Sequence, residues 1–233
     1  MSTDQEAPSK GLASKRGRST QTPIGGEVYE ELLSRILASQ IGPGGRITID
    51  AIARDLGVSQ TPIREALHRL DADGVVVRTH MAGYRVAPKI TREQFENLVE
   101  VRLLLEPAAA RRAAERMTDD ELGELRSVAD SMTPSMIADS GDRGYALFSQ
   151  RDASLHDAIA EGGRNTFIRD SLARLHTHVH LFRLSDHANI TERAIKEHSE
   201  IIAAIGRRDP DAAAYAMRHH VEASAERFRT AFD

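Results

Sequence analysis

Cysteine is absent from the 233 residues of this chain. Without thiols, neither a disulfide framework nor a thiolate metal site can form. Nothing else in the composition indicates an oxidising compartment, so we expect the protein in the cytoplasm.

Long apolar runs are also missing. The first 22 residues are polar, rich in serine, threonine and basic side chains, and lack the apolar core of a signal peptide. No later stretch approaches the length of a transmembrane helix. These absences predict no membrane partner. We interpret residues 1–22 as a flexible basic arm, which is either a solvated tail or a contact for DNA phosphates.

An excess of basic residues, typical of nucleic-acid-binding proteins, is missing from the whole chain, whose net charge is −4. The length suits two domains of unequal size, so charge is counted by segment. Residues 23–90 hold eight basic and eight acidic side chains, whereas residues 91–233 hold 19 basic and 25 acidic ones. The acidity therefore lies in the C-terminal part, and the N-terminal part is free to approach phosphates.

Three helices are predicted in the N-terminal part. Apolar residues recur at helical spacing from Glu27 to Leu37, before the turn at residues 42–45. Thr48 or Asp50 can cap a second helix, which ends at Gly57. Ser59 can cap a third helix over residues 61–73, with its apolar side chains on one face.

Two short β-branched segments follow, at residues 75–78 and 84–86, and residues 81–83 can form the turn between them. Residues 23–88 are thus predicted to form a winged helix-turn-helix, which lays its recognition helix in the major groove of DNA. A winged helix that serves only protein contacts is the alternative.

The outward side chains of the third helix are the candidate DNA contacts. Ser59 and Thr61 can donate to phosphates, and Arg64 can reach a guanine edge or a phosphate. Weaker candidates are Arg69, Arg78 and Arg85.

Residues 89–233 show no strand signal. Helical periodicity continues in about six segments separated by turn and capping residues. The fold class is therefore mainly α: an N-terminal winged helix-turn-helix followed by an all-α helical bundle.

Histidines and a carboxylate in this second part form a candidate metal site. Asp152 and His156 are four residues apart, a step of about 40° around a helix, so both lie on one face. His198 and His220 are flanked by apolar faces and are expected to point inward. Imidazoles with one carboxylate suit Zn²⁺ or Ni²⁺, and four protein ligands favour a sensing site over an open catalytic one. The alternative is that these histidines are solvated or hydrogen-bonded core residues.

Three further histidines alternate along the chain at positions 176, 178 and 180. His176 and His180 share one helical face and His178 points elsewhere, so the three do not suit chelation by one helix. We interpret His176 or His180 as an effector contact or, alternatively, as partly exposed near a pocket mouth.

The segment GVSQTPIREALHRLDADGVVVRTHMAGYRV, residues 57–86, resembles the winged helix of GntR-type bacterial regulators. The resemblance covers roughly residues 25–88. Its most specific positions are Val58, Ser59, Thr61, Pro62, Arg64, Glu65, Ala66 and Leu67, followed by Leu70, Gly74 and, at the wing tip, Gly83.

Two positions depart from that pattern. Many relatives carry arginine where this chain has Gln60, and some carry a basic residue where Asp50 stands. Glutamine can read an adenine edge with two hydrogen bonds, whereas arginine prefers guanine, so a shifted base preference is our hypothesis.

The C-terminal part resembles the helical effector domain, of FCD type, in the FadR-like branch of GntR regulators. The similarity spans roughly residues 91–230 and includes the opening helix VRLLLEPAAARRAA. It implies that Asp152, His156, His198 and His220 hold a divalent metal and that Arg102 pairs with an organic acid. Further effector contacts are expected at Asn165 and His176.

Together these features predict a transcription regulator, a repressor rather than an enzyme, that binds operator DNA as a homodimer. A small carboxylate bound at the metal and Arg102 would change the spacing of the recognition helices and release DNA; the alternative is that the ligand enhances DNA binding. One alternative is a metal sensor in which the ion itself is the signal. Another is a metal-dependent hydrolase fused to a DNA-binding module.

Overall fold

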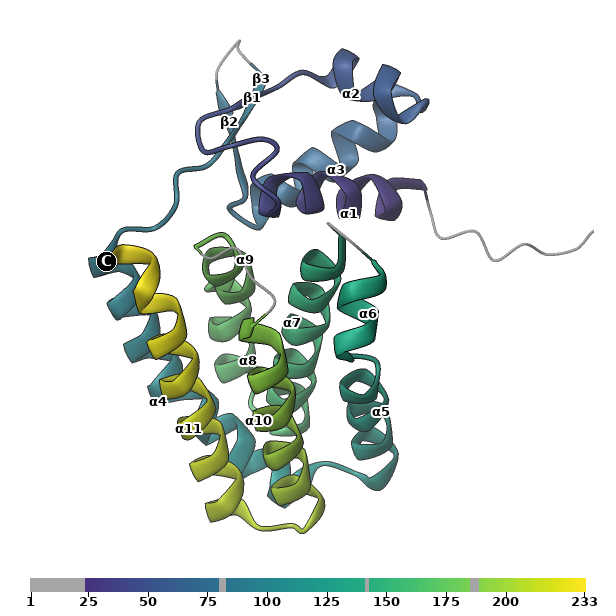
Figure 1. Ribbon diagram of the computed structural model, residues 1–233. Helices are drawn as coiled ribbons and strands as arrows, with labels where there is room; N and C mark the ends of the chain where they lie inside the picture. Colours follow the sequence, from purple (N-terminus) through teal and green to yellow (C-terminus); the bar gives the residue numbers. More distant parts are fainter. Residues whose placement is uncertain (1–23, 80–82, 141–142, 185–188) are drawn as a thin grey trace, which may run out of the picture.

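The computed structural model describes residues 24–79, 83–140, 143–184 and 189–233, and it places a small N-terminal domain across one end of a helical bundle (Figure 1). The predicted basic arm at residues 1–22 lies outside the described residues, as do Met81 and Ala82 of the predicted wing turn. The described part confirms the fold class, a winged helix-turn-helix followed by an all-helical domain.

The N-terminal domain consists of three helices and a small sheet. Gly57 takes the left-handed conformation that ends α2 (φ 66°), which allows the tight turn into α3. Ser59 and Thr48 occupy the predicted N-cap positions, but neither side chain makes a capping hydrogen bond. The elements are α1 (Ile24–Leu37), β1 (Arg46–Ile47), α2 (Ile49–Leu56), α3 (Gln60–Ala72), β2 (Val76–Thr79) and β3 (Gly83–Val86).

The sheet has three antiparallel strands in the order β1-β3-β2, whereas the sequence predicted two. Val76 of β2 pairs with Val86 of β3, and Arg46 of β1 pairs with Arg85 on the other side of β3. β1 is only two residues long, so it carries no alternating pattern that sequence analysis could detect.

The second domain contains eight α-helices among the described residues, compared with the predicted six or so. The difference arises from α6 and α9, which have six residues each and are too short for helical periodicity. α8 and α9 are separated at His176, whose φ is 45°. The helices are α4 (Arg92–Arg116), α5 (Asp119–Asp130), α6 (Pro134–Asp139), α7 (Gly144–Gly162), α8 (Thr166–Arg174), α9 (Thr177–Phe182), α10 (Asn189–Gly206) and α11 (Pro210–Arg229), followed by a 3-10 turn (Thr230–Phe232).

α4 and α11 run antiparallel along one side of the bundle (Figure 1). Ion pairs join the start of α4 to the end of the chain, Arg92 with Asp233, and one turn further on, Glu96 with Arg229. Thr91 and Gln94 form a reciprocal capping box that fixes where α4 begins. The register of the two helices is therefore set at the end that faces the winged domain.

The two domains contact each other at several points. α1 packs against α7, Asp73 Oδ1 at the end of α3 lies 3.9 Å from His176 Nδ1, and Arg183 donates to the carbonyl of Ala87 in the connecting segment. Among the described residues, no helix combines the length and apolar character that a membrane crossing requires.

Candidate DNA-binding surface and histidine-lined cavity

The N-terminal end of α3 gathers the predicted DNA contacts on one exposed surface: Ser59, Gln60, Thr61 and Arg64. Gln60 donates through Nε2 to Asp50 Oδ1 at 2.6 Å, and its Oε1 accepts from Arg64 Nη2 at 3.2 Å. The two hydrogen bonds hold the Gln60 amide between α2 and the outer face of α3. Its polar end is thus oriented before any DNA is bound.

The remaining predicted contacts lie elsewhere. The guanidinium carbon of Arg69 lies 4.2 Å from the centroid of the Tyr29 ring, so Arg69 stacks on α1 at the far end of α3. Gly83 begins β3 in the wing with φ 82°, a conformation that glycine adopts without strain.

Three of the four predicted metal ligands converge inside the bundle. The ring centroids of His156, His198 and His220, on α7, α10 and α11, are 4.7–5.6 Å apart. One nitrogen from each ring lies within 4.8 Å of the other two. His198 and His220 are almost fully buried. Helices far apart in sequence therefore present their imidazoles to one shared point.

The fourth predicted ligand, Asp152, lies beside this trio. Its Oδ1 is 3.3 Å from His198 Nε2 and 4.0 Å from His156 Nε2. Both ring nitrogens of His156 and of His198 are buried without a hydrogen-bond partner among the described residues. Buried polar atoms without partners are costly, and coordination of a cation would satisfy them. The donor set therefore fits a divalent metal.

An outer shell orients His220. Its Nδ1 lies 2.8 Å from Glu197 Oε2, and Glu197 in turn accepts hydrogen bonds from Arg227. A carboxylate behind the imidazole is the usual support for a metal-binding histidine. Burial lowers the pKa of His220 to about 3, so its ring is neutral and its other nitrogen keeps a lone pair.

A buried ion pair adjoins the trio. Arg102 and Glu106 lie one turn apart on α4, with Arg102 Nε 2.6 Å from Glu106 Oε1. Glu106 Oε2 is also 2.8 Å from His156 Nδ1, although without the alignment of a hydrogen bond. Burial alone would raise the pKa of the Glu106 carboxyl. The charges of Arg102 and His156, with the hydrogen bonds from Arg102, outweigh burial, so the pKa of Glu106 lies well below its usual range. Sequence analysis did not predict Glu106 as a site residue. Its position four residues after Arg102 on a predicted helix could have indicated that the two side chains form an ion pair.

A cavity of about 390 Å³ opens beside these groups. Arg102, Glu106, Asp152 and His156 line its inner part, and Arg102 Nη1 is buried without a partner among the described residues. His176 and His178 line it from the start of α9, although His178 was expected to point elsewhere.

The DNA-binding domain also contributes to this cavity. Asp73, at the end of the recognition helix, lines it, and Asp73 Oδ1 is 3.9 Å from His176 Nδ1. Asn165 is not among the lining residues; its side chain instead caps α8 by accepting from the amide of Ile168. The cavity is therefore an interdomain feature, which sequence analysis did not predict.

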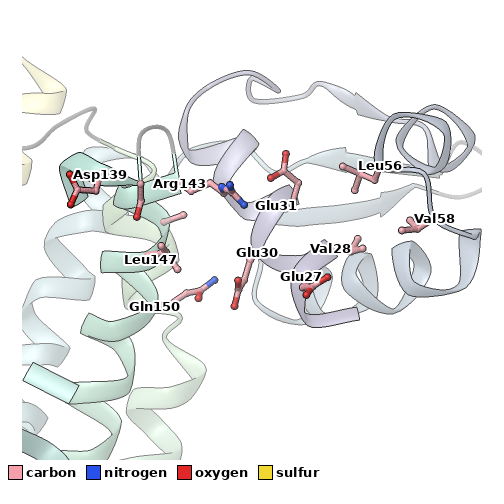
Figure 2. Close-up of a pocket in the computed structure, with 12 residues that line it drawn as sticks. Glu27, Val28, Glu30, Glu31, Leu56, Val58, Asp139, Arg143, Leu147 and Gln150 are labelled. Carbon is pink, nitrogen blue, oxygen red and sulfur yellow. The ribbon is translucent and has the colours of Figure 1, made fainter. Parts of the chain in front are cut away.

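A second cavity, of about 610 Å³, separates α1 from the α6–α7 region. Figure 2 shows its side chains facing each other across the gap, with Glu27 and Glu30 from the DNA-binding domain opposite Leu147 and Gln150 of α7. The two domains thus meet along only part of their facing surfaces.

The fold and the exposed end of α3 define a DNA-binding regulator that joins a winged helix to an all-helical domain. The family comparisons agree with that class. Residues 25–86 match the model for bacterial regulatory proteins of the gntR family, and residues 97–223 match the FCD domain. The chain belongs to the FCD-containing branch of the GntR family, whose members are transcriptional regulators rather than enzymes.

Named relatives extend over nearly the whole chain. The transcriptional repressor RspR of Escherichia coli is 26% identical over 210 residues, covering 89% of this chain and 90% of its own. The galactonate operon transcriptional repressor of Escherichia coli is 27% identical, covering 84% and 92%. Among solved structures, Escherichia coli McbR/YncC superposes with a TM-score of 0.66 at 19% identity, over 91% of this chain and 100% of that one, which shows a shared fold.

Proposed function

We propose that this protein represses transcription by binding operator DNA as a homodimer, and that a small organic acid bound in the 390 Å³ cavity changes its affinity for DNA. The observation that carries the proposal is the composition of the cavity wall. The buried Arg102 lines the cavity together with His156, one member of the histidine trio, and Asp73 at the end of the recognition helix lines it as well.

The inner wall suits a carboxylate. Arg102 is 3% exposed, and its Nε donates a hydrogen bond to Glu106. Its Nη1 has no partner among the described residues and is an available donor. An anionic oxygen would satisfy that donor with a charge-assisted hydrogen bond. The apolar parts of the wall, including Ala153, Ala160 and Leu172, would exclude water from the rest of the ligand.

A divalent metal, Zn²⁺ or Ni²⁺, would be held by His156, His198, His220 and Asp152. When bound, it would supply positive charge for a ligand oxygen. His220 is kept in orientation by Glu197, and Arg227 holds Glu197. These outer contacts fix the imidazole in one position.

Asp73 would connect ligand binding to DNA binding. It accepts a hydrogen bond from Tyr29 and lies near His176, so it touches both α1 and the cavity mouth. A ligand can change DNA affinity only if it binds two domain arrangements with different affinities. A bound anionic ligand would repel the Asp73 carboxylate in the cavity wall. The ligand would therefore disfavour the domain arrangement in which Asp73 lines the cavity, and the end of α3 would move away.

Elemental analysis of the purified protein tests the metal site first. We expect one divalent metal per chain in the native protein, and loss of that metal in His198→Ala and in His220→Ala, because each variant removes one converging nitrogen. His219→Ala is the matched control, since His219 is the exposed neighbour of His220. Metal absent from every sample, with all variants folded by circular dichroism, would contradict the metal site and leave the DNA-binding role intact.

A further inference from the structure

Asp50 of α2 is joined to Gln60 and Arg64 of α3 by a network of hydrogen bonds. Gln60 Nε2 donates to Asp50 Oδ1 at 2.6 Å, and Gln60 Oε1 accepts from Arg64 Nη2 at 3.2 Å. All three residues are exposed. α2 and α3 pack together, and the start of α3 lies on the side of the N-terminal domain that points away from the helical bundle (Figure 1). The network is therefore accessible to DNA.

The two charged neighbours of Gln60 determine which way its carboxamide is turned. An ionised carboxylate can only accept hydrogen bonds, and a guanidinium can only donate them. A half-turn of the carboxamide would place Gln60 Oε1 against Asp50 and Gln60 Nε2 against Arg64, and both contacts would be repulsive. Hydrogen bonds to charged partners are also stronger than those between neutral groups. Asp50 and Arg64 therefore hold Gln60 in one of two orientations.

The oriented carboxamide retains one hydrogen on Nε2 and one lone pair on Oε1. Adenine presents the N7 acceptor and the N6 amino donor in the major groove, so it can use both. Guanine presents two acceptors, N7 and O6, and one of them would face the Gln60 oxygen. A carboxamide that turned freely would instead offer its amino group to either purine. Fixing the orientation of Gln60 therefore favours adenine over guanine.

The charge of Asp50 has two further effects. A carboxylate on the surface that approaches DNA repels phosphates and lowers the affinity for DNA of any sequence. Asp50 also lies in the first turn of α2, where a carboxylate stabilises the helix. Neither effect depends on which base Gln60 faces. A change in base preference therefore distinguishes a role in recognition from a role in helix stability or in general DNA affinity.

We propose that Asp50 determines base specificity through Gln60: it fixes the orientation of the Gln60 carboxamide and so excludes guanine from the base pair that Gln60 faces. Asp50 is thus a positioning residue, and Gln60 makes the base contact. The inference rests on the operator binding of the proposed function and on base reading by Gln60. It adds a residue of α2 to the recognition surface of α3.

Competition between two DNA duplexes tests the proposal. One carries the site that the native protein selects from a random pool. The other has guanine in place of adenine at the position whose preference is abolished in Gln60→Ala. We expect the native protein to prefer adenine by about tenfold and Asp50→Ala to prefer it by only about twofold. Asp50→Asn should retain most of the native preference, because the asparagine oxygen still accepts from Gln60 Nε2.

Two further variants isolate the effect. Asp50→Ala and Asp50→Asn both remove the charge, so a general gain in DNA affinity is common to them and cancels in the ratio of the two duplexes. Asp55→Ala is the matched control, since it removes another carboxylate of α2, one that pairs with Arg35, and should leave the native preference unchanged. In a Gln60→Ala background, adding Asp50→Ala should have no further effect on the ratio.

Different results would overturn different steps. A native preference in Asp50→Ala would show that Asp50 does not orient Gln60, and an equal loss in Asp50→Asn would assign the preference to the charge alone. An effect of Asp50→Ala that persists in Gln60→Ala would mean that Asp50 contacts the base itself. A selected site in which no adenine depends on Gln60 would exclude base reading by Gln60, and the role of Asp50 with it, while operator binding stands. Failure of the native protein to select any site would contradict operator binding.

Discussion

At the scale of single residues, Arg102 and Glu106 form a buried ion pair in the wall of the 390 Å³ cavity. Both side chains are nearly removed from solvent, with 3% and 5% exposed. Two charges in such a place stabilise the fold only while each has its partner. The pair also leaves Arg102 Nη1 buried without a partner among the described residues, and in the proposed function this atom donates to the organic acid.

Removal of one partner should be costly. We expect Glu106→Leu to lower the free energy of unfolding by about 3 kcal/mol, because it leaves the Arg102 charge buried without its carboxylate. Adding Arg102→Met should recover most of that loss, since no buried charge then remains. Urea denaturation followed by circular dichroism measures both.

The exposed pair of Arg169 and Asp157 provides the comparison, with side chains 37% and 46% exposed. Asp157→Asn should change the free energy of unfolding by less than about 1 kcal/mol, as is usual for surface ion pairs. An unchanged unfolding midpoint in Glu106→Leu would mean that Arg102 does not depend on Glu106.

At the scale of elements, α3 performs two roles at its two ends. Its N-terminal end presents Gln60 and Arg64 to solvent, joined by a hydrogen bond. Its C-terminal end places Arg69 on the Tyr29 ring and Asp73 in the wall of the ligand cavity. A rigid helix between them can transmit a displacement from the cavity to the DNA-reading end.

Gln60 is expected to set base preference. We predict that the native protein selects sites with adenine at the position Gln60 faces and that Gln60→Arg shifts this preference to guanine, because the two side chains form different paired hydrogen bonds. Selection of binding sites from a random DNA pool measures the change. Arg169→Lys is the control, since Arg169 lies on α8 of the second domain and its replacement should leave the selected sequence unchanged. Identical sites for Gln60→Arg and the native chain would exclude base reading by Gln60.

At the scale of the whole molecule, Asp73 joins the two domains, because it contacts both Tyr29 of α1 and His176 of the helical domain. Tyr29, Asp73 and His176 form a chain of neighbours from α1 through the end of α3 to the start of α9. Burial, with the hydrogen bond to Asp73 and its charge, raises the pKa of the Tyr29 hydroxyl well above its usual value, so the hydroxyl remains a donor at all physiological pH values.

Tyr29→Phe removes that donor and should loosen the end of α3 from α1, and with it the contact that Asp73 makes with His176 of the second domain. We expect the free energy of unfolding to fall by about 1 kcal/mol and amide exchange to increase at the end of α3 and in α9. Hydrogen exchange read by mass spectrometry measures the second effect. Tyr215→Phe should change neither segment, because Tyr215 is exposed on the far α4–α11 face. Exchange that is unaltered at both segments would show that the Tyr29–Asp73 hydrogen bond has no influence on the contact between Asp73 and His176.

The sequence by itself predicted the winged helix, the helical second domain and the three histidines that converge inside it. Ile63, Ala66, Leu67 and Leu70 repeat at helical spacing and are all buried, because the period of a helix decides which side chains face inward. Gly57 ends α2 as predicted, since the left-handed turn there favours glycine. Such signals are local and can be read from neighbouring residues.

Only the tertiary structure decided what the ligand cavity contains. Asp73 and His178 enter its wall through contacts between segments that are far apart in the chain, which no periodicity records. His176 breaks the predicted helix with a positive φ that is unusual for a residue other than glycine, so the sequence held no turn signal there. Glu106 became a site residue because the fold brought His156 against it. Packing between segments that are distant in the chain therefore decided which side chains line the cavity. The local sequence pattern decided only where the helices that carry these side chains form.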